Sequence, residues 1–368
     1  MRLAALELVN FRSWKALSVR VPGGPVAIVG PNATGKTSIL EAAWYSATLG
    51  SHRTSTDAAM VRAGEEAAIV RTTVEHDGRS DLIELEVVRL GRPRTKLGGS
   101  PVGRRRDVLG ILKASLFAPE RVAVVRGDPA DRRRFIDELL VQLHPRYRAV
   151  IREYERALRQ RNALLREAGG RVPAGLEGWD EALAGPGGQL CAGRAEAARA
   201  LAPAAARAFE AVGGSPALTV AYAPNTAPSS DPAPPSAWSE ALRRRIEERR
   251  QDETARGVTL VGPHRDDLSL AIGELPARAH ASQGEAWLAA LALVLGSHEA
   301  LREQSGELPV LLLDDAFSLL DPERRARLAS ALPEGTQIIA TASDPNECPT
   351  SLPWSLMRVT VDGVSGDA

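Results

Sequence analysis

Cysteine, lysine and long apolar runs are all scarce in this chain. Its two cysteines, Cys191 and Cys348, are too few for a disulfide scaffold or a cysteine-built zinc site. The longest uninterrupted apolar run, residues 287–295, is far shorter than the roughly 20 residues that span a bilayer. The first residues also lack the apolar core of a signal peptide. We therefore expect a soluble, cytoplasmic protein with no membrane partner.

The chain also lacks an excess of either charge. Its formal net charge is +0, so no overall field attracts nucleic acid, and any basic surface must be local. The length of 368 residues exceeds one ordinary domain and predicts two or three.

The clearest motif lies in residues 26–49. An apolar run over residues 26–29 predicts a buried strand, and apolar residues at helical spacing after position 38 predict a helix. The stretch between them fits the phosphate-binding pattern G-x-x-x-x-G-K-[ST]. The predicted ATP-binding residues are Gly30, Pro31, Asn32, Ala33, Thr34, Gly35, Lys36, Thr37 and Ser38.

The chemistry of this loop points to ATP and Mg²⁺ as cofactors. Gly30 and Gly35 let the backbone curl so that its N–H groups, and the helix N-terminus, face phosphate oxygens. Lys36 can reach the β- and γ-phosphates as a catalytic residue, and the Thr37 hydroxyl can bind the metal. Only four of the 46 basic residues are lysines, and one stands here. An ammonium and a guanidinium are not interchangeable at a phosphate.

A second apolar strand, residues 309–313, is followed by Asp314 and Asp315. An acid at the carboxyl end of a neighbouring parallel strand lies beside the magnesium of such a site. We predict that Asp314 binds the metal and that Asp315 is catalytic, orienting or deprotonating the attacking water. The alternative is a helix N-cap after a core strand, because aspartate caps helices well.

The order of motifs indicates the subclass. Ser282, Gln283, Gly284 and Glu285 open an apolar helix before the acidic strand, and Asp321 follows that strand. A phosphate loop, a long insertion, S-x-G-E, an acidic strand and then L-D is the order of ABC-type ATPases. A helix start is a second phosphate-binding device, so we predict that it contacts the nucleotide of a partner in an ATP-dependent homodimer.

The insertion contains a basic stretch. Residues 121–166 hold 12 arginines and six acids, and Arg132, Arg133 and Arg134 are the predicted DNA contacts. A solvated helix face, or a brace between two parts of the protein, is the alternative.

Other local patterns predict two strands in residues 3–21, a hairpin at Asp77-Gly78, a helix over 104–117, a helix over 179–212 interrupted at 185–188, and a disordered loop over 223–237.

With these motifs in place, the chain resembles the RecF family of recombination-repair proteins, which are relatives of the SMC-type ATPase heads. The matching stretches are LELVNFRSW (6–14), GPNATGKTS (30–38), SHRT (51–54) with Asp57, LFAPERVAVVRGDPADRRRFID (116–137), TLVGPHRDDL (259–268), ASQGE (281–285) and LLLDDAFSLLD (311–321). The resemblance implies an α/β fold, with an ABC/SMC-type P-loop ATPase head at residues 1–118 plus 282–368. An inserted, mainly helical arm would occupy residues 119–281.

The resemblance further implies slow ATP hydrolysis coupled to dimerisation, and binding to DNA at junctions of duplex and single strand. It also implies work with RecR and RecO to load RecA. The sequence departs from the family in five places, one of which is the break at residues 185–188 in what is commonly a continuous arm helix. Ala33 replaces a glycine, Glu285-Ala286-Trp287 replaces Gln-Gln-Arg, Leu319 replaces a glutamate, and Thr341 stands where ABC transporters have a histidine.

Two other function classes compete with this interpretation. An ATPase that moves a protein or small-molecule cargo would need a docking surface and a short insertion. The long insertion and its arginines instead favour DNA, whose phosphates attract basic side chains. A small-molecule kinase that uses the phosphate loop alone would leave the segment Ser282–Gly284 without a role.

Overall fold

The computed structural model describes residues 1–368 except 55, 231, 319, 361–362 and 367–368. One six-stranded sheet is antiparallel, in the order β2-β1-β4-β5-β6-β7. Its strands are β1 (Arg2–Phe11), β2 (Trp14–Arg20), β4 (Ala67–His76), β5 (Arg79–Val88), β6 (Thr95–Leu97) and β7 (Ser100–Pro101). The two predicted N-terminal strands and the hairpin are confirmed. Asp77 and Gly78 have φ of 46° and 70°, as a two-residue turn between twisted strands requires.

The second six-stranded sheet has the order β15-β14-β3-β13-β12-β8, and only the edge pair β14–β15 is antiparallel. Its strands are β3 (Pro25–Val29), β8 (Ala114–Phe117), β12 (Val310–Leu313), β13 (Ile338–Ala342), β14 (Ser355–Val359) and β15 (Val364–Gly366). Helix α1 (Lys36–Thr48) packs against strands of both sheets and is almost wholly buried. The carboxyl ends of β3 and β12 therefore meet at one edge, which is where the phosphate loop and the two acids follow.

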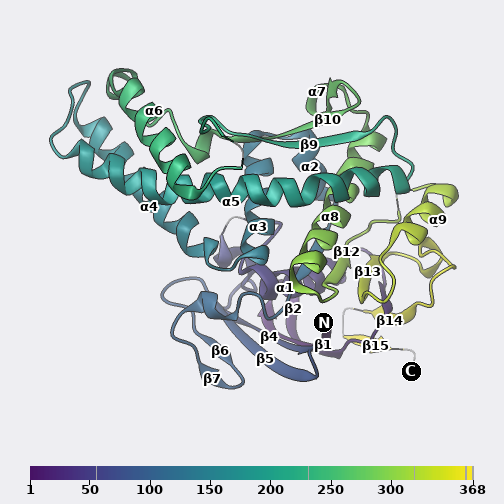
Figure 1. Cartoon of the computed structure of the whole chain (residues 1–368). Helices are drawn as coiled ribbons and strands as arrows, with labels where there is room; N and C mark the ends of the chain where they lie inside the picture. The colour runs from purple at the N-terminus through teal and green to yellow at the C-terminus, as the bar shows by residue number, and fades with distance from the viewer. Residues whose placement is uncertain (55, 231, 319, 361–362, 367–368) are drawn as a thin grey trace.

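The remaining elements are mostly helices above the sheets (Figure 1). They are α2 (Ala123–Arg126), α3 (Pro129–Leu143), α4 (Tyr147–Glu167), α5 (Leu176–Ala211), α6 (Pro235–Arg256), α7 (Ala277–His280), α8 (Gln283–Ser305) and α9 (Pro322–Ala331). A three-stranded sheet of β9 (Leu218–Ala223), β10 (Asp267–Ile272) and β11 (Leu275–Pro276) lies with them. Helices α4 and α5 form an antiparallel pair, and α5 also packs along α8. The proposed division into head and arm thus crosses a close helix–helix contact.

The helix predicted over residues 104–117 is wrong. Residues 105–108 form a single 3₁₀ turn, and residues 114–117 form β8, in which every residue is buried. This strand pairs in parallel with β12 from Val310–Ala114 to Leu313–Phe117. A short apolar run does not distinguish a buried strand from a helix, and here the long-range pairing decides.

The predicted interruption of the helix at residues 185–188 is also wrong, because α5 is continuous from Leu176 to Ala211. A Cβ on Gly188 would lie 2.4 Å from the backbone nitrogen of Ser239, and one on Gly187 would lie 2.6 Å from Leu242. The glycines therefore permit close approach of α6 rather than breaking the helix. Tertiary packing has overridden their low helix propensity.

The loop predicted over residues 223–237 is shorter in the structure, because Ala223 ends β9 and Pro235 begins α6; the described residues between them are irregular, as predicted, but make defined contacts. The Asn225 backbone N–H donates to Asp266 Oδ1 at 2.7 Å. Pro224, Ala227 and Pro228 line a small cavity against α5 and Trp238. The prolines give this segment a fixed path over the arm.

Candidate nucleotide site

The phosphate loop begins directly after β3 and ends in α1, as predicted. Gly35 has φ of 99°, and a Cβ there would lie 2.7 Å from Trp14 Nε1. The Trp14 indole N–H donates to the Gly35 carbonyl at 3.2 Å. Ala33 adopts φ of 65°, a left-handed conformation that costs an alanine about 1 kcal/mol. The departure from glycine at position 33 therefore adds strain to the loop.

Lys36 lies across this loop. Its Nζ donates to the carbonyls of Gly30 at 2.6 Å and Pro31 at 2.9 Å. Burial lowers the pKa of the Lys36 ammonium, while the nearby Asp315 and Asp314 oppose that shift. The charged group is thus already held at the site where phosphates would be bound.

Thr37 and Asp314 meet as a metal site requires. Thr37 Oγ1 donates to Asp314 Oδ1 at 3.1 Å, joining the start of α1 to the end of β12. Burial raises the pKa of Asp314, which means that the surrounding protein groups do not fully stabilise the negative charge of its carboxylate. A hydroxyl and a carboxylate are oxygen ligands of the kind that Mg²⁺ prefers. The residues present therefore fit a bound magnesium ion.

Asp315 has φ of 52°, which turns its side chain away from the line of β12. Its backbone N–H donates to Thr341 Oγ1 at 2.9 Å, and burial raises the pKa of its carboxyl. In the sequence, Thr341 is notable only because ABC transporters have a histidine at that position. In the structure it lies at the end of β13 and contacts both acids.

These residues surround a cavity of about 370 Å³, which we call the nucleotide cavity. It is lined by Ser13, Asn32, Ala33, Gly35, Lys36, Thr37, Ser38, Arg53, Pro119, Glu120, Asp314, Asp315, Thr341 and Ser343. Sequence reasoning gave no role in nucleotide binding to Ser13, Arg53, Glu120 or Ser343. Of these, Ser13, Arg53 and Glu120 lie in stretches that carried the family resemblance, which was the only signal for them.

The S-x-G-E segment lies elsewhere. Ser282 is exposed and caps α8; its hydroxyl accepts the Glu285 N–H at 3.2 Å, and its own N–H donates to Glu285 Oε2 at 2.8 Å. Ser282 to Glu285 are not among the described residues that line the nucleotide cavity. Of the departure at 285–287, Trp287 has a structural role, because it is buried with its ring centroid 4.7 Å from that of Phe117.

Asp321 caps α9, and its side chain accepts the Arg324 N–H at 2.9 Å. Its carboxylate is about half exposed and also lies 3.6 Å from Arg324 Nε. It does not line the nucleotide cavity in the part of the chain that the structure describes, so its assignment as the L-D element of an ABC-type ATPase stays a prediction. The departure at Leu319 lies outside the described residues.

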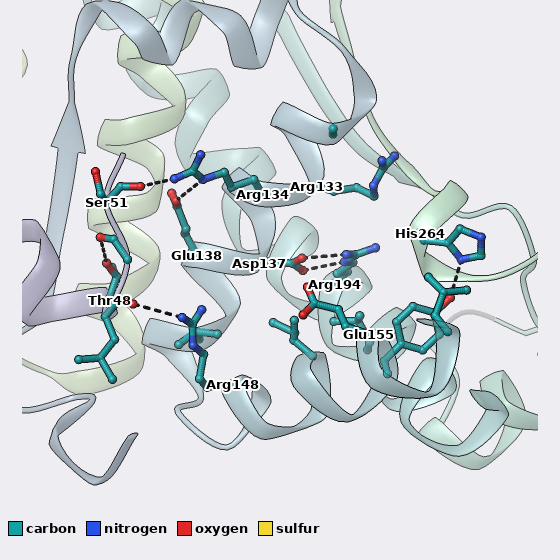
Figure 2. Close-up of a pocket in the computed structure, with 18 of the residues that line it drawn as sticks. Thr48, Ser51, Arg133, Arg134, Asp137, Glu138, Arg148, Glu155, Arg194 and His264 are labelled. Carbon is teal, nitrogen blue, oxygen red and sulfur yellow. Dashed lines mark hydrogen bonds and ion pairs between the residues drawn. The ribbon is translucent and has the colours of Figure 1, made fainter. Parts of the chain in front are cut away.

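The three predicted DNA contacts all bond within the chain, and Figure 2 shows the bonds of Arg134. Arg132 is buried, and its guanidinium binds both oxygens of Asp267, at 2.6 and 2.8 Å. This pair joins two segments of the proposed arm rather than the arm to the head, and the predicted contact of Arg132 with DNA stays a prediction. Arg133 Nη1 donates to the Asp266 carbonyl at 2.8 Å, and Arg134 binds Glu138 and the Ser51 carbonyl.

Comparison with known proteins agrees with this geometry. The sequence profile of the RecF/RecN/SMC N terminal domain family matches residues 2–361. A "DNA replication and repair protein RecF" from Frankia alni is 46% identical over 365 residues, which is 96% of each chain. A protein of the same name from Streptomyces avermitilis is 45% identical over 362 residues, or 95% of each chain. These relatives decide against the cargo-transporting and kinase alternatives.

Solved structures give the same result. A structure of "the recombination mediator protein RecF-ATPrS in RecFOR pathway" has a TM-score of 0.89 and 27% identity, covering 100% of this chain and 98% of that one. A structure of RecF-ATP has a TM-score of 0.88. An Smc head bound to the C-winged helix domain of ScpA, at a TM-score of 0.55 and 16% identity, shares the fold. In the described residues, no helix is long and apolar enough to cross a membrane. The chain therefore belongs to the RecF/RecN/SMC N terminal domain family, as a RecF-type DNA replication and repair protein with an ATPase head.

Proposed function

We propose that this protein is an ATP-gated clamp on DNA, in which two chains enclose two ATP molecules. The observation that supports it most is the separation of Ser282 from the nucleotide cavity. Each chain has a phosphate loop with its metal ligands, and also an exposed helix start suited to anions that its own cavity does not use. Pairing two chains would complete both sites.

The residues around the cavity have distinct roles in this proposal. Lys36 and the loop N–H groups bind the β- and γ-phosphates, and Thr37 with Asp314 would hold Mg²⁺. When bound, the ion would supply positive charge that stabilises the transferring phosphoryl group. Asp315 orients the attacking water and accepts its proton. Because burial raises the pKa of Asp315, its carboxylate is a stronger base than an exposed aspartate.

The partners follow from the RecF relatives. One solved relative is described as a recombination mediator in the RecFOR pathway, so we propose RecR and RecO as partners here. In that pathway the protein would bind DNA at junctions of duplex and single strand in the cytoplasm and help to load RecA. Slow hydrolysis of ATP would then cause the two chains to dissociate and release the DNA. We propose residues 1–118 plus 282–368 as the head and 119–281 as the arm.

A salt titration of DNA affinity with and without a slowly hydrolysed ATP analogue tests the clamp. With the analogue, we expect tighter binding and a steeper salt dependence, because two chains would release more counterions from DNA than one. Duplex with a single-stranded gap and plain duplex should be compared at each salt concentration. Equal affinity with and without nucleotide on every DNA would contradict the proposal.

A further inference from the structure

The segment that follows α1 lies between the nucleotide cavity and the arm. We call residues 49–54 the junction segment. Arg53 lines the nucleotide cavity. Leu49, Gly50, Ser51 and Thr54 line a second cavity, of about 490 Å³, against α3 and α4 (Figure 2). A stretch of six residues therefore has one side toward the nucleotide and the other toward the arm.

The Ser51 side chain organises the nucleotide side of this segment. Its hydroxyl accepts the backbone N–H groups of Arg53 at 3.0 Å and Thr54 at 3.2 Å, and donates to Glu41 Oε1. The fully buried Glu41 also binds Arg12 at 2.6 and 2.8 Å and lies 3.6 Å from Arg53 Nη1. Ser51 thus holds the backbone of Arg53 directly and shares Glu41 with its guanidinium.

The arm holds the other side of the segment. Arg134 of α3 donates through Nη2 to the Ser51 carbonyl and through Nε to Glu138 at 3.2 Å. Arg148 of α4 donates to the Leu49 carbonyl at 3.2 Å. Both carbonyls lie just past the C-terminal end of α1, where the helix dipole favours cations. Helix α1 therefore points its N-terminus at the phosphates and has its C-terminal end held by arginines of the arm.

Arg53 is the only charged residue of the junction segment. The neighbouring His52 is buried, and neither ring nitrogen has a hydrogen-bond partner among the described residues. Burial, helped by Arg121 and Arg53, lowers the pKa of His52 to about 3, so its ring stays neutral. Any shift of the segment therefore moves one positive charge relative to the nucleotide.

We propose that Arg134 is a positioning residue for the nucleotide site. By holding the Ser51 carbonyl, it sets the place of Arg53 at the rim of the nucleotide cavity. This inference rests on the proposed function, since it supposes that a triphosphate occupies that cavity. In this proposal Arg134 controls ATP affinity instead of contacting DNA. A change in the position of the arm would then change the affinity of the nucleotide cavity through the bond between Arg134 and the Ser51 carbonyl.

The test measures binding of a fluorescent ATP analogue to the full chain without DNA. Arg134→Met keeps the aliphatic stem and removes the donors, and should weaken binding about three- to tenfold. Arg134→Lys should restore part of the loss, because an ammonium can still donate to the Ser51 carbonyl. Arg278→Met is the matched control, since it removes only the exposed pair with Asp128 beside α3. The melting temperature of the nucleotide-free variants reports any general loss of structure.

A double variant tests the route through Arg53. If Arg134 acts by placing Arg53, then Arg53→Met with Arg134→Met should bind no more weakly than Arg53→Met alone. Additive losses, or parental affinity in Arg134→Met, would overturn the inference. Lys36→Ala in the same assay distinguishes failure of the nucleotide site itself from failure of the role proposed for Arg134. Parental affinity in that variant would overturn the nucleotide site and this inference together, whereas failure of Arg134→Met alone leaves the site intact.

Discussion

The Thr341 hydroxyl donates to Asp314 Oδ1 at 2.6 Å and accepts the backbone N–H of Asp315 at 2.9 Å. One side chain at the end of β13 therefore fixes both acids at the end of β12. Thr37 reaches the same Asp314 oxygen from α1. The metal ligand and the proposed base are thus held by neighbours on two other elements, not by their own strand.

Thr341→Val should raise the Mg²⁺ concentration needed for half-maximal ATP hydrolysis. Valine keeps the shape of threonine but leaves the Asp315 N–H without its partner and Asp314 Oδ1 with the Thr37 hydroxyl alone, which costs about 1–3 kcal/mol for the unpaired group. Thr341→Ser keeps the hydroxyl and should behave like the parent. The measurement is a Mg²⁺ titration of the hydrolysis rate, and an unchanged midpoint in the valine variant would remove Thr341 from the site.

Asp314→Asn should stabilise the nucleotide-free protein while abolishing hydrolysis. Burial raises the pKa of Asp314, so the folded protein binds this proton more tightly than the unfolded chain does. Stability is then lost as pH rises through the raised pKa, and the charged carboxylate is unfavourable at pH 7. We expect a melting temperature about 2 °C above the parent at pH 7, and no gain near pH 3. A lower melting temperature at pH 7 would contradict this view of the site.

Asp315→Asn should bind ATP as the parent does but hydrolyse it more slowly. The amide cannot accept the proton of the attacking water, so a loss of about 100-fold is expected in single turnover. In the parent, the rate should fall as pH drops through the raised pKa of Asp315, because the base must be deprotonated. The variant should lack that acid limb. A parental single-turnover rate would show that another group is the base.

Arg132→Met should lower stability and leave the salt dependence of DNA binding unchanged. It breaks a partly buried pair with Asp267, whose carboxylate is 35% exposed, so we expect a cost of about 1–2 kcal/mol, below that of a fully buried pair. A joint change of Arg152, Arg156 and Arg159 on the exposed face of α4 is the comparison, and should flatten the salt slope at normal stability. A flatter slope in Arg132→Met would support its predicted contact with DNA.

The sequence predicted the parts of the site that depend on local spacing. The strand, loop and helix around Lys36 lie within 24 residues, and Asp314 follows its own buried strand directly. What it could not predict depends on distant neighbours. Nothing in the sequence marks Thr341 as a site residue, because its contacts with the two acids depend on the pairing of β13 with β12. The positive charge of Arg132 likewise does not show that its partner is Asp267, which is 135 positions away.

The two errors in secondary structure have the same origin. A break in the helix was predicted at Gly187 and Gly188 because glycine has a low helix propensity. In the structure the two glycines instead allow α6 to approach α5 closely. The segment Ala114–Phe117 was predicted as helix because so short a run, with three apolar residues and Ser115, has no period of its own; pairing with β12 decides its conformation.

Hydrolysis by a mixture of Ser282→Arg and Lys36→Ala tests the shared ATP site most directly. Ser282→Arg should bind one ATP per chain but not dimerise, because the longer side chain blocks approach to a partner's phosphate. In a mixed dimer, one composite site joins the intact phosphate loop of one chain to the intact Ser282 of the other. We predict that each variant alone is inactive and that mixing restores part of the parental rate. No recovery on mixing, or normal ATP-dependent dimers of Ser282→Arg in sedimentation, would contradict the account.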